Sequence, residues 1–239
     1  MYLENVVFDA VEPQRLGRFW EAVVGSERLT DELDAFETRL TVKRGPVLDL
    51  CFQRVPEPPS EPLRLHLDLA GGSRQAEEVD RLLALGGRHL DIGQGDVPWV
   101  VLADAEGNPF CVMEERAVYV GTGPIAALPL NSADPDRDAA FWSWLTGWTV
   151  AVGVAPRSLR HPSGRGPLIE LLPELVPKGG TKNRLHLDVR LEIEDHPESV
   201  AEGIRQRGGD ELRTDWGELP WCSYTDPSGN EFCVLPART

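Results

Sequence analysis

The stretch Arg64-Leu65-His66-Leu67-Asp68-Leu69 returns almost letter for letter as Arg184-Leu185-His186-Leu187-Asp188-Val189. Successive side chains of a β-strand point to opposite faces. In both copies we therefore expect the aliphatic residues to face a core and the Arg, His and Asp side chains to share the other face. The two histidines are 120 positions apart (66 to 186), a repeat long enough to be a whole domain and too long for a solenoid unit.

Other residues recur at a spacing of 122 positions. The pairs are Phe19-Trp20 with Phe141-Trp142, Gly86-Gly87 with Gly208-Gly209, Pro98-Trp99 with Pro220-Trp221, and Gly107-Asn108 with Gly229-Asn230. The repeat divides the 239 residues into two domains of ordinary size, which we place at 1–116 and 117–239. The stretch Gly121-Thr122-Gly123-Pro124 is typical of a linker between them.

Composition excludes several classes of partner. The net charge is −15, from 39 acidic and 24 basic residues, and lysine occurs at only three positions. Nucleic acids and anionic membranes require clustered cations, so we expect neither as a partner. No apolar run approaches the ~20 residues of a membrane span, and no signal segment opens the chain, so a cytoplasmic protein is expected. The four cysteines lack the spacing of a disulfide framework or a zinc finger.

The hydrophobic pattern predicts a strand, a helix and further strands in each quarter of the chain. Helices are expected at residues 12–25, 73–85, 134–147 and 197–207, where apolar residues recur at helical spacing. Three of them open at a proline (Pro13, Pro135 and Pro197), and glycines at positions 25, 86 and 147 end the first three. Strands are expected at residues 4–10, 36–43, 47–53, 64–69, 99–102 and 110–113, and in the second half at 127–131, 148–154, 168–172, around His186, 221–225 and 231–235. The order corresponds to four βαβββ units.

This order resembles the glyoxalase/bleomycin-resistance/dioxygenase group, also called the vicinal oxygen chelate superfamily. The resemblance rests on Leu-His-Leu-Asp at 65–68 and 185–188, on Phe-Trp in the first helix of each half, and on Asp-Pro-Ser-Gly-Asn-Glu-Phe-Cys-Val at 226–234. It covers nearly the whole chain. It implies an α+β fold of two tandem domains, in which four βαβββ modules form two cup-shaped mixed sheets with the helices outside. A divalent metal or an organic ligand sits in the concave side of such a cup.

The resemblance also indicates where a metal would bind. Metal-dependent members take ligands, usually His or Gln, Glu, His and Glu, from the first, fourth, fifth and eighth strands of a cup. Matched by position, the first domain offers Asn5, Asp49, His66 and Cys111, and the second offers Ala127, Glu170, His186 and Cys233. The candidate metal ligands are therefore His186, Glu170, His66 and Asp49, and the two cysteines stand where a Glu is usual.

The cysteines decide which metal is compatible. A thiol removes the oxygen donor that hard octahedral ions prefer. A set of His, carboxylate and thiolate suits Zn²⁺ instead. The alternative is that both cysteines are small apolar core residues, and this reading favours a site with no metal at all.

The polar face of the repeated strand supplies candidate catalytic residues. His66, His186, Asp68 and Asp188 have the chemistry of general acid/base catalysis, because a carboxylate beside an imidazole orients it and shifts its pKa. The alternative is a buried His-Asp-Arg network that stabilises the sheet. Candidate ligand-binding residues are Arg64 and Arg184 on the same face and Trp99 and Trp221 on strands that follow proline, although packing in the core is the alternative for the tryptophans.

Two functions remain compatible with the sequence. One is an enzyme of lyase, isomerase or dioxygenase type acting on a small organic molecule, and the other is a metal-free protein that sequesters a hydrophobic or aromatic compound. In both, the partner is a small-molecule ligand. We expect the second domain, which carries Glu170, to retain the chemistry and the first to be structural. A monomer is plausible beside a homodimer, because one chain supplies both partners of the dimer that is usual in the superfamily.

Overall fold

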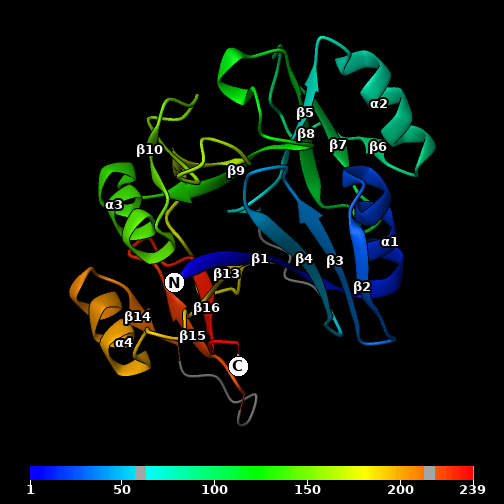
Figure 1. The fold of residues 1–239 in the computed structure, drawn as a ribbon. Helices are drawn as coiled ribbons and strands as arrows, with labels where there is room; N and C mark the ends of the chain where they lie inside the picture. Colours follow the sequence, from blue (N-terminus) through cyan, green and yellow to red (C-terminus); the bar gives the residue numbers. More distant parts are fainter. Residues whose placement is uncertain (58–62, 213–218, 239) are drawn as a thin grey trace.

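The computed structural model describes residues 1–57, 63–212 and 219–238. Within these residues, sixteen strands, four α-helices and one short 3₁₀ helix are arranged as four consecutive βαβββ modules that form two eight-stranded mixed sheets (Figure 1). This is the predicted α+β class. Among the described helices, none is both long enough and apolar enough to cross a membrane.

Sheet A has the strand order β14-β15-β16-β13-β1-β4-β3-β2. Its strands are β1 (Tyr2–Ala10), β2 (Glu27–Asp31), β3 (Ala35–Thr41), β4 (Val47–Arg54), β13 (Leu185–Arg190), β14 (Asp210–Glu211), β15 (Cys222–Thr225) and β16 (Glu231–Leu235). The first and the last module of the chain therefore share one sheet.

Sheet B has the strand order β10-β11-β12-β9-β5-β8-β7-β6. Its strands are β5 (Asp68–Gly72), β6 (Arg88–His89), β7 (Val100–Ala103), β8 (Pro109–Glu114), β9 (Ile125–Ser132), β10 (Thr149–Ala151), β11 (Arg157–Arg160) and β12 (Leu168–Pro173). The second and the third module share this sheet.

Each sheet thus combines one module from each half of the chain. In sheet A, β1 pairs in antiparallel fashion with β13 of the other half, and in sheet B, β5 pairs in the same way with β9. The expectation that each domain forms its own cup is therefore wrong. The repeat identifies the modules, but it does not determine which strand edges join.

The four helices lie within two residues of their predicted ranges. They are α1 (Pro13–Val24), α2 (Gln75–Ala84), α3 (Pro135–Thr146) and α4 (Pro197–Gln206). Helices α1 and α3 begin at a proline and end at glycines with left-handed backbone, Gly25 with φ 66° and Gly147 with φ 71°. Helix α1 packs against β3 and β4, α2 against β5 and β8, α3 against β11 and β12, and α4 against β14.

The two faces of β13 confirm the predicted alternation. Leu185, Leu187 and Val189 belong to the hydrophobic core, whereas His186 and Asp188 line a cavity on the opposite face of sheet A. The core itself includes the repeated Phe-Trp pairs. The ring of Trp20 lies 5.1 Å from Phe110, and that of Trp142 lies 5.5 Å from Phe232, so these tryptophans stabilise the packing and do not contact the cavity.

The first copy of the repeated stretch is less regular than predicted. Residues 64–67 form no strand apart from an isolated bridge between Leu65 and Leu130, and β5 begins only at Asp68. The neighbouring strand β9 contains Pro129, whose carbonyl accepts a bond from the backbone N–H of His66 at 3.2 Å. Proline has no N–H to return that bond. In sheet A, Val7 lies at this position opposite His186, and the ladder is continuous.

Candidate functional site

A cavity of about 760 Å³ lies on the concave face of sheet A, bordered by β1, β3, β4, β13, β15 and β16 and by the segments that follow β4 and precede β15. Its apolar lining includes Val7, Phe52, Val55, Leu212, Leu219, Trp221 and Leu235. Its polar lining includes Asn5, Glu37, Lys182, His186, Asp188, Ser223 and Cys233. Both halves of the chain contribute, so the cavity depends on the exchange of modules between the sheets.

A buried cluster of His186, Asp188 and Cys233 forms one wall of this cavity. Nε2 of His186 lies 3.4 Å from Oδ1 of Asp188, and Sγ of Cys233 lies 3.8 Å from the same Nε2. The first two residues are two positions apart on β13, so their side chains share a face. The parallel pairing of β13 with β16 sets Cys233 directly beside Asp188. Asn5 completes the cluster by donating a hydrogen bond from Nδ2 to Oδ2 of Asp188 at 3.0 Å.

Burial controls the charge of these groups. Loss of solvent lowers the pKa of His186 to about 3, with a smaller effect from the nearby positive charge of Lys182, so the imidazole is neutral at pH 7. Burial raises the pKa of Asp188 to about 7, and the hydrogen bond from Asn5 partly opposes this rise. Burial and the charge of Asp188 raise the pKa of the Cys233 thiol to about 12.

A hard octahedral ion of the superfamily's usual kind does not fit this face. Both oxygens of Asp49 are occupied by Arg39, with Nε to Oδ1 at 2.8 Å and Nη2 to Oδ2 at 2.7 Å. The amide of Asn5 is bonded to Asp188. The last usual ligand position holds a thiol. The residues at three of the four usual positions are therefore engaged elsewhere or chemically unsuitable.

Glu170 does not join this cluster. It lies on β12 in sheet B, where its Oε1 accepts a bond from the backbone N–H of Val154 at 3.0 Å. The expectation that Glu170 and His186 share one cup is therefore wrong. Glu170 lies beside Pro129 in the register of sheet B, whereas Asp49 lies beside Asn5 in sheet A.

Sheet B carries a matching cluster of His66, Asp68 and Cys111. Nε2 of His66 lies 3.4 Å from Oδ1 of Asp68. Here the segment between the two halves covers part of the face, because its 3₁₀ helix (Ala117–Tyr119) places Tyr119 against a cluster that includes Cys111, while the His66 side chain stays 27% exposed. The Tyr119 hydroxyl lies 3.4 Å from Oε2 of Glu170.

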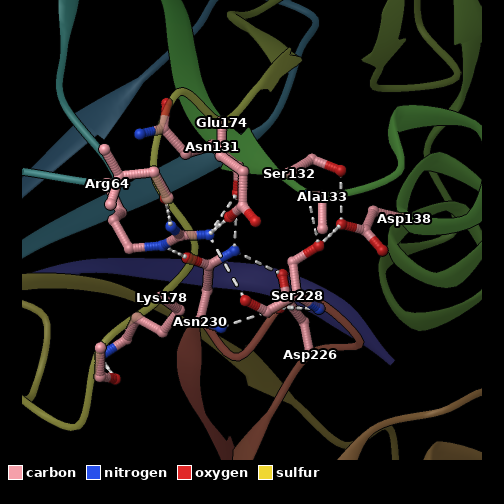
Figure 2. Close-up of polar contacts among 12 residues, drawn as sticks. Arg64, Asn131, Ser132, Ala133, Asp138, Glu174, Lys178, Asp226, Ser228 and Asn230 are labelled. Carbon is pink, nitrogen blue, oxygen red and sulfur yellow. Dashed lines mark hydrogen bonds and ion pairs between the residues drawn. The ribbon is translucent and has the colours of Figure 1, made fainter.

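Arg64 lies in a polar network away from the cavity lining. Figure 2 shows its guanidinium between Asn230 and Glu174, with Nε donating to Oδ1 of Asn230 at 2.7 Å and Nη2 donating to Oε2 of Glu174 at 2.6 Å. These contacts join the segment before β5 to the turn between β15 and β16. The structure therefore assigns Arg64 to the junction of the halves. Its counterpart Arg184 is also absent from the cavity lining, and its Nε has no hydrogen-bond partner among the described residues.

The two candidate tryptophans have different surroundings. Trp221 lines the sheet A cavity. Trp99 lies immediately before β7, where the guanidinium of Arg116 is 5.7 Å from the ring centroid, and it packs against the hydrophobic cluster that includes Tyr119. Of the two, Trp221 is the one that the structure places at the cavity.

Two residues that shape the sites were missed by sequence reasoning. Arg39 could have been found, because the turn after residue 41 joins two strands and their pairing brings Arg39 opposite Asp49. Tyr119 carried no signal, because a single aromatic residue in a linker has no pattern that relates it to a sheet. It is Tyr119 that distinguishes the covered cup from the open one.

The comparisons with known proteins agree with the fold and the duplication. The family model described as "Glyoxalase-like domain" matches residues 5–113 and 127–235. A search of curated proteins found no match. Among solved structures, glyoxalase I from Zea mays superposes with a TM-score of 0.67 at 15% identity, covering 98% of this chain and 92% of that one. A putative dioxygenase from Bacillus subtilis subsp. subtilis str. 168 superposes with a TM-score of 0.63 at 14% identity, covering 100% of this chain and 86% of that one.

At such identities the superpositions establish a common fold and leave the chemistry open. The two matches of the family model cover most of the sequence, one in each half. The chain therefore belongs to the family of glyoxalase-like domain proteins, within the vicinal oxygen chelate superfamily, and carries that domain twice in tandem.

Proposed function

We propose that the sheet A cavity binds a small organic molecule with an apolar, aromatic body and a polar end. The observation that carries the proposal is the cavity itself: about 760 Å³, within the range of roughly 300–1,000 Å³ that is usual for sites of this kind. A bound molecule would contact residues of both halves.

The lining supports this choice of ligand. Trp221 is partly exposed and offers aromatic surface to the cavity, which favours stacking with a planar molecule. The polar groups lie together on the sheet, where His186 and Asp188 face the cavity and Asn5 is bonded to Asp188. An apolar pocket with a few convergent polar groups orients a ligand that is itself polar at one end.

The tryptophans provide a matched test. We expect the uncharged fluorophore N-phenyl-1-naphthylamine to bind the chelator-treated protein with enhanced emission. Trp221→Ala should weaken this binding about tenfold, because it removes an aromatic contact of roughly 1–2 kcal/mol. Trp99→Ala, the equivalent change in the covered cup, should leave the dissociation constant within about twofold. Absence of binding, or equal weakening by both variants, would contradict the proposal.

A second candidate function is transformation of the bound molecule, by lyase, isomerase or oxygenase chemistry. The observation in its favour is that a His–Asp pair, His186 and Asp188, lies on the wall of a cavity large enough for a substrate. Such a pair can exchange a proton with a ligand. Compounds that displace the fluorophore should be incubated with the protein and followed by mass spectrometry. Product that forms with the native chain and not with His186→Asn would support an enzyme, and unchanged compounds in every case would leave sequestration as the function.

A further inference from the structure

The geometry points to a tetrahedral metal site of the zinc type, in which His186, Asp188 and Cys233 bind the ion and the fourth position faces the sheet A cavity. The ion would lie at the polar end of the proposed binding site. The inference does not require that an organic molecule binds there. It differs from the superfamily's usual metal site in its ligands. Asp188 supplies the oxygen ligand, and Asn5 and Asp49, at the usual positions on the first and fourth strands, do not bind the ion.

The spacing of the donor atoms is that of ligands around one small ion. Bond lengths of about 2.0–2.3 Å and tetrahedral angles place a nitrogen and an oxygen ligand about 3.3 Å apart, and a nitrogen and a sulfur ligand about 3.6 Å apart. The observed distances are 3.4 Å from His186 Nε2 to Asp188 Oδ1 and 3.8 Å from that nitrogen to Cys233 Sγ. The two distances from His186 therefore lie within about 0.2 Å of those expected around one ion, and one ligand atom from each of the three residues lies within 4.8 Å of the others.

An unpartnered buried atom supports the same conclusion. Oδ1 of Asp188 is buried and accepts no hydrogen bond from an N–H or O–H group among the described residues, although buried carboxylate oxygens are nearly always partnered. The thiol of Cys233 is its weak hydrogen-bonding neighbour. Oδ1 is the oxygen that faces Nε2 of His186. The other oxygen, Oδ2, is held by Asn5 at 3.0 Å. The carboxylate is therefore fixed in orientation with one oxygen left for a further partner.

The fold holds the three donors in place without help from loops. His186 and Asp188 lie on β13, and the pairing of β13 with β16 places Cys233 opposite Asp188. All three side chains are more than nine-tenths buried. The hydrogen bond from Asn5 acts on a ligand from outside, as the supporting partners of metal ligands usually do. A site built on strands loses little entropy when it binds an ion.

The same trio occurs in sheet B as His66, Asp68 and Cys111, and Oδ1 of Asp68 is likewise buried without a hydrogen bond from an N–H or O–H group of the described residues. The second and the fourth module, which lie in different sheets, therefore have the same arrangement of side chains, including the carboxylate oxygen without an N–H or O–H donor. In sheet A the cavity leaves space for a fourth ligand, such as water or the polar end of a bound molecule. In sheet B the segment around Tyr119 packs on Cys111 and covers part of the corresponding face.

The donor types select the metal. One nitrogen, one oxygen and one sulfur in tetrahedral spacing suit Zn²⁺, and Co²⁺ replaces it with the same geometry. Calcium and magnesium require six or more oxygen ligands and do not fit. Three protein ligands with an open fourth position are typical of zinc sites that contact a ligand or substrate.

The test uses the full-length Cys111→Ser protein, which lacks the sulfur of the sheet B cluster, after removal of metals by a chelator. Titration with Co²⁺ should produce a thiolate-to-cobalt charge-transfer band and tetrahedral visible bands that saturate at one equivalent, and Zn²⁺ should abolish them. Adding Cys233→Ser should remove the charge-transfer band. Adding Asp188→Asn should weaken Co²⁺ binding at least tenfold. Adding Cys222→Ser, a change at an exposed thiol, should have no effect.

Two results would overturn the inference: no charge-transfer band in the Cys111→Ser protein, or a band that persists undiminished when Cys233 is also replaced. Circular dichroism should show that each variant is folded, and Asp188→Asn, which keeps the size of the side chain, carries the test if Cys233→Ser does not fold. Binding of N-phenyl-1-naphthylamine by the metal-free protein decides the proposed function separately. A negative outcome in one of the two experiments therefore does not contradict the proposal that the other experiment tests.

Discussion

Replacing Asp226 by Asn should lower the free energy of unfolding by about 3–5 kcal/mol, an effect typical of breaking a buried network around a charge. Asp226 is 2% exposed and accepts four hydrogen bonds. Its Oδ1 receives the backbone N–H groups of Ser228 and Asn230 at 2.9 and 2.8 Å. Its Oδ2 receives Nε1 of Trp142 at 3.1 Å and Nδ2 of Asn230 at 2.9 Å.

The substitution is severe because it turns an acceptor into a donor. An Asn side chain has one oxygen, so its NH₂ group must face at least one of the two donor pairs. The same turn carries Asn230, which binds Arg64 in the network that joins the halves (Figure 2). We therefore expect the turn between β15 and β16, the buried indole of Trp142 and the Arg64 contacts to be weakened together. Urea denaturation followed by circular dichroism at pH 7.5 measures the change.

The duplication provides matched comparisons. Asp104 in the first half accepts the same four kinds of bond, from Trp20, from the backbone and side chain of Asn108, and from the backbone of Glu106. Asp104→Asn should therefore destabilise by a similar amount. Asp80→Asn, at an exposed position of α2, should change stability by less than about 0.5 kcal/mol. A loss below about 1 kcal/mol for Asp226→Asn would show that the network contributes little.

These aspartates show what local patterns in the sequence can predict. The Gly-Asn pairs at 107–108 and 229–230 are typical turn residues, because glycine and asparagine accept left-handed backbone, and Gly107 and Gly229 have φ of 87° and 81°. The helix ends at Gly25 and Gly147 followed from the same reasoning. The bond from each turn aspartate to a tryptophan 84 residues away was not predictable, because no local pattern records which side chain a turn will contact.

Strand predictions were less complete where apolar alternation is weak. Strand β2 has five residues, Glu-Arg-Leu-Thr-Asp, and none is fully buried, so it gave no signal. The single strand expected at 148–154 is instead β10 (Thr149–Ala151) followed by β11 (Arg157–Arg160). Both belong to the outer part of sheet B, where burial imposes a weaker pattern.

The candidate site was predicted in part. The shared face of His186 and Asp188 followed from strand geometry, and the position of Cys233 followed from the resemblance. What could not be predicted is which of the two histidines would meet which carboxylate, because that depends on the exchange of modules. The pairing of β1 with β13 sets Asn5 opposite Asp188, 183 positions away. Nothing in either segment specifies that contact.

The exchange of modules leads to the last prediction, which concerns the two halves of the chain. Expressed separately, residues 1–116 and 117–239 should not form stable folded monomers. In the first half, β1 would lose β13 and β5 would lose β9, so two long strand edges would be exposed, and such edges promote association. The main hydrophobic core also includes residues from both halves. We expect each half alone to aggregate or self-associate, as size-exclusion chromatography with light scattering would show.

Mixing the two halves during refolding should produce a one-to-one complex with the circular dichroism and fluorophore binding of the intact chain, because each half supplies the edges that the other lacks. A matched control tests whether the strand pairing between the halves, and not the continuous chain, holds the protein together. With a protease site inserted at residues 121–124, the cleaved protein should remain associated in native buffer, since β1–β13, β5–β9 and the Arg64 network still join the halves. Two folded monomers after cleavage, or a cooperatively unfolding monomer from either half, would contradict the shared sheets and with them the composite origin of the cavity.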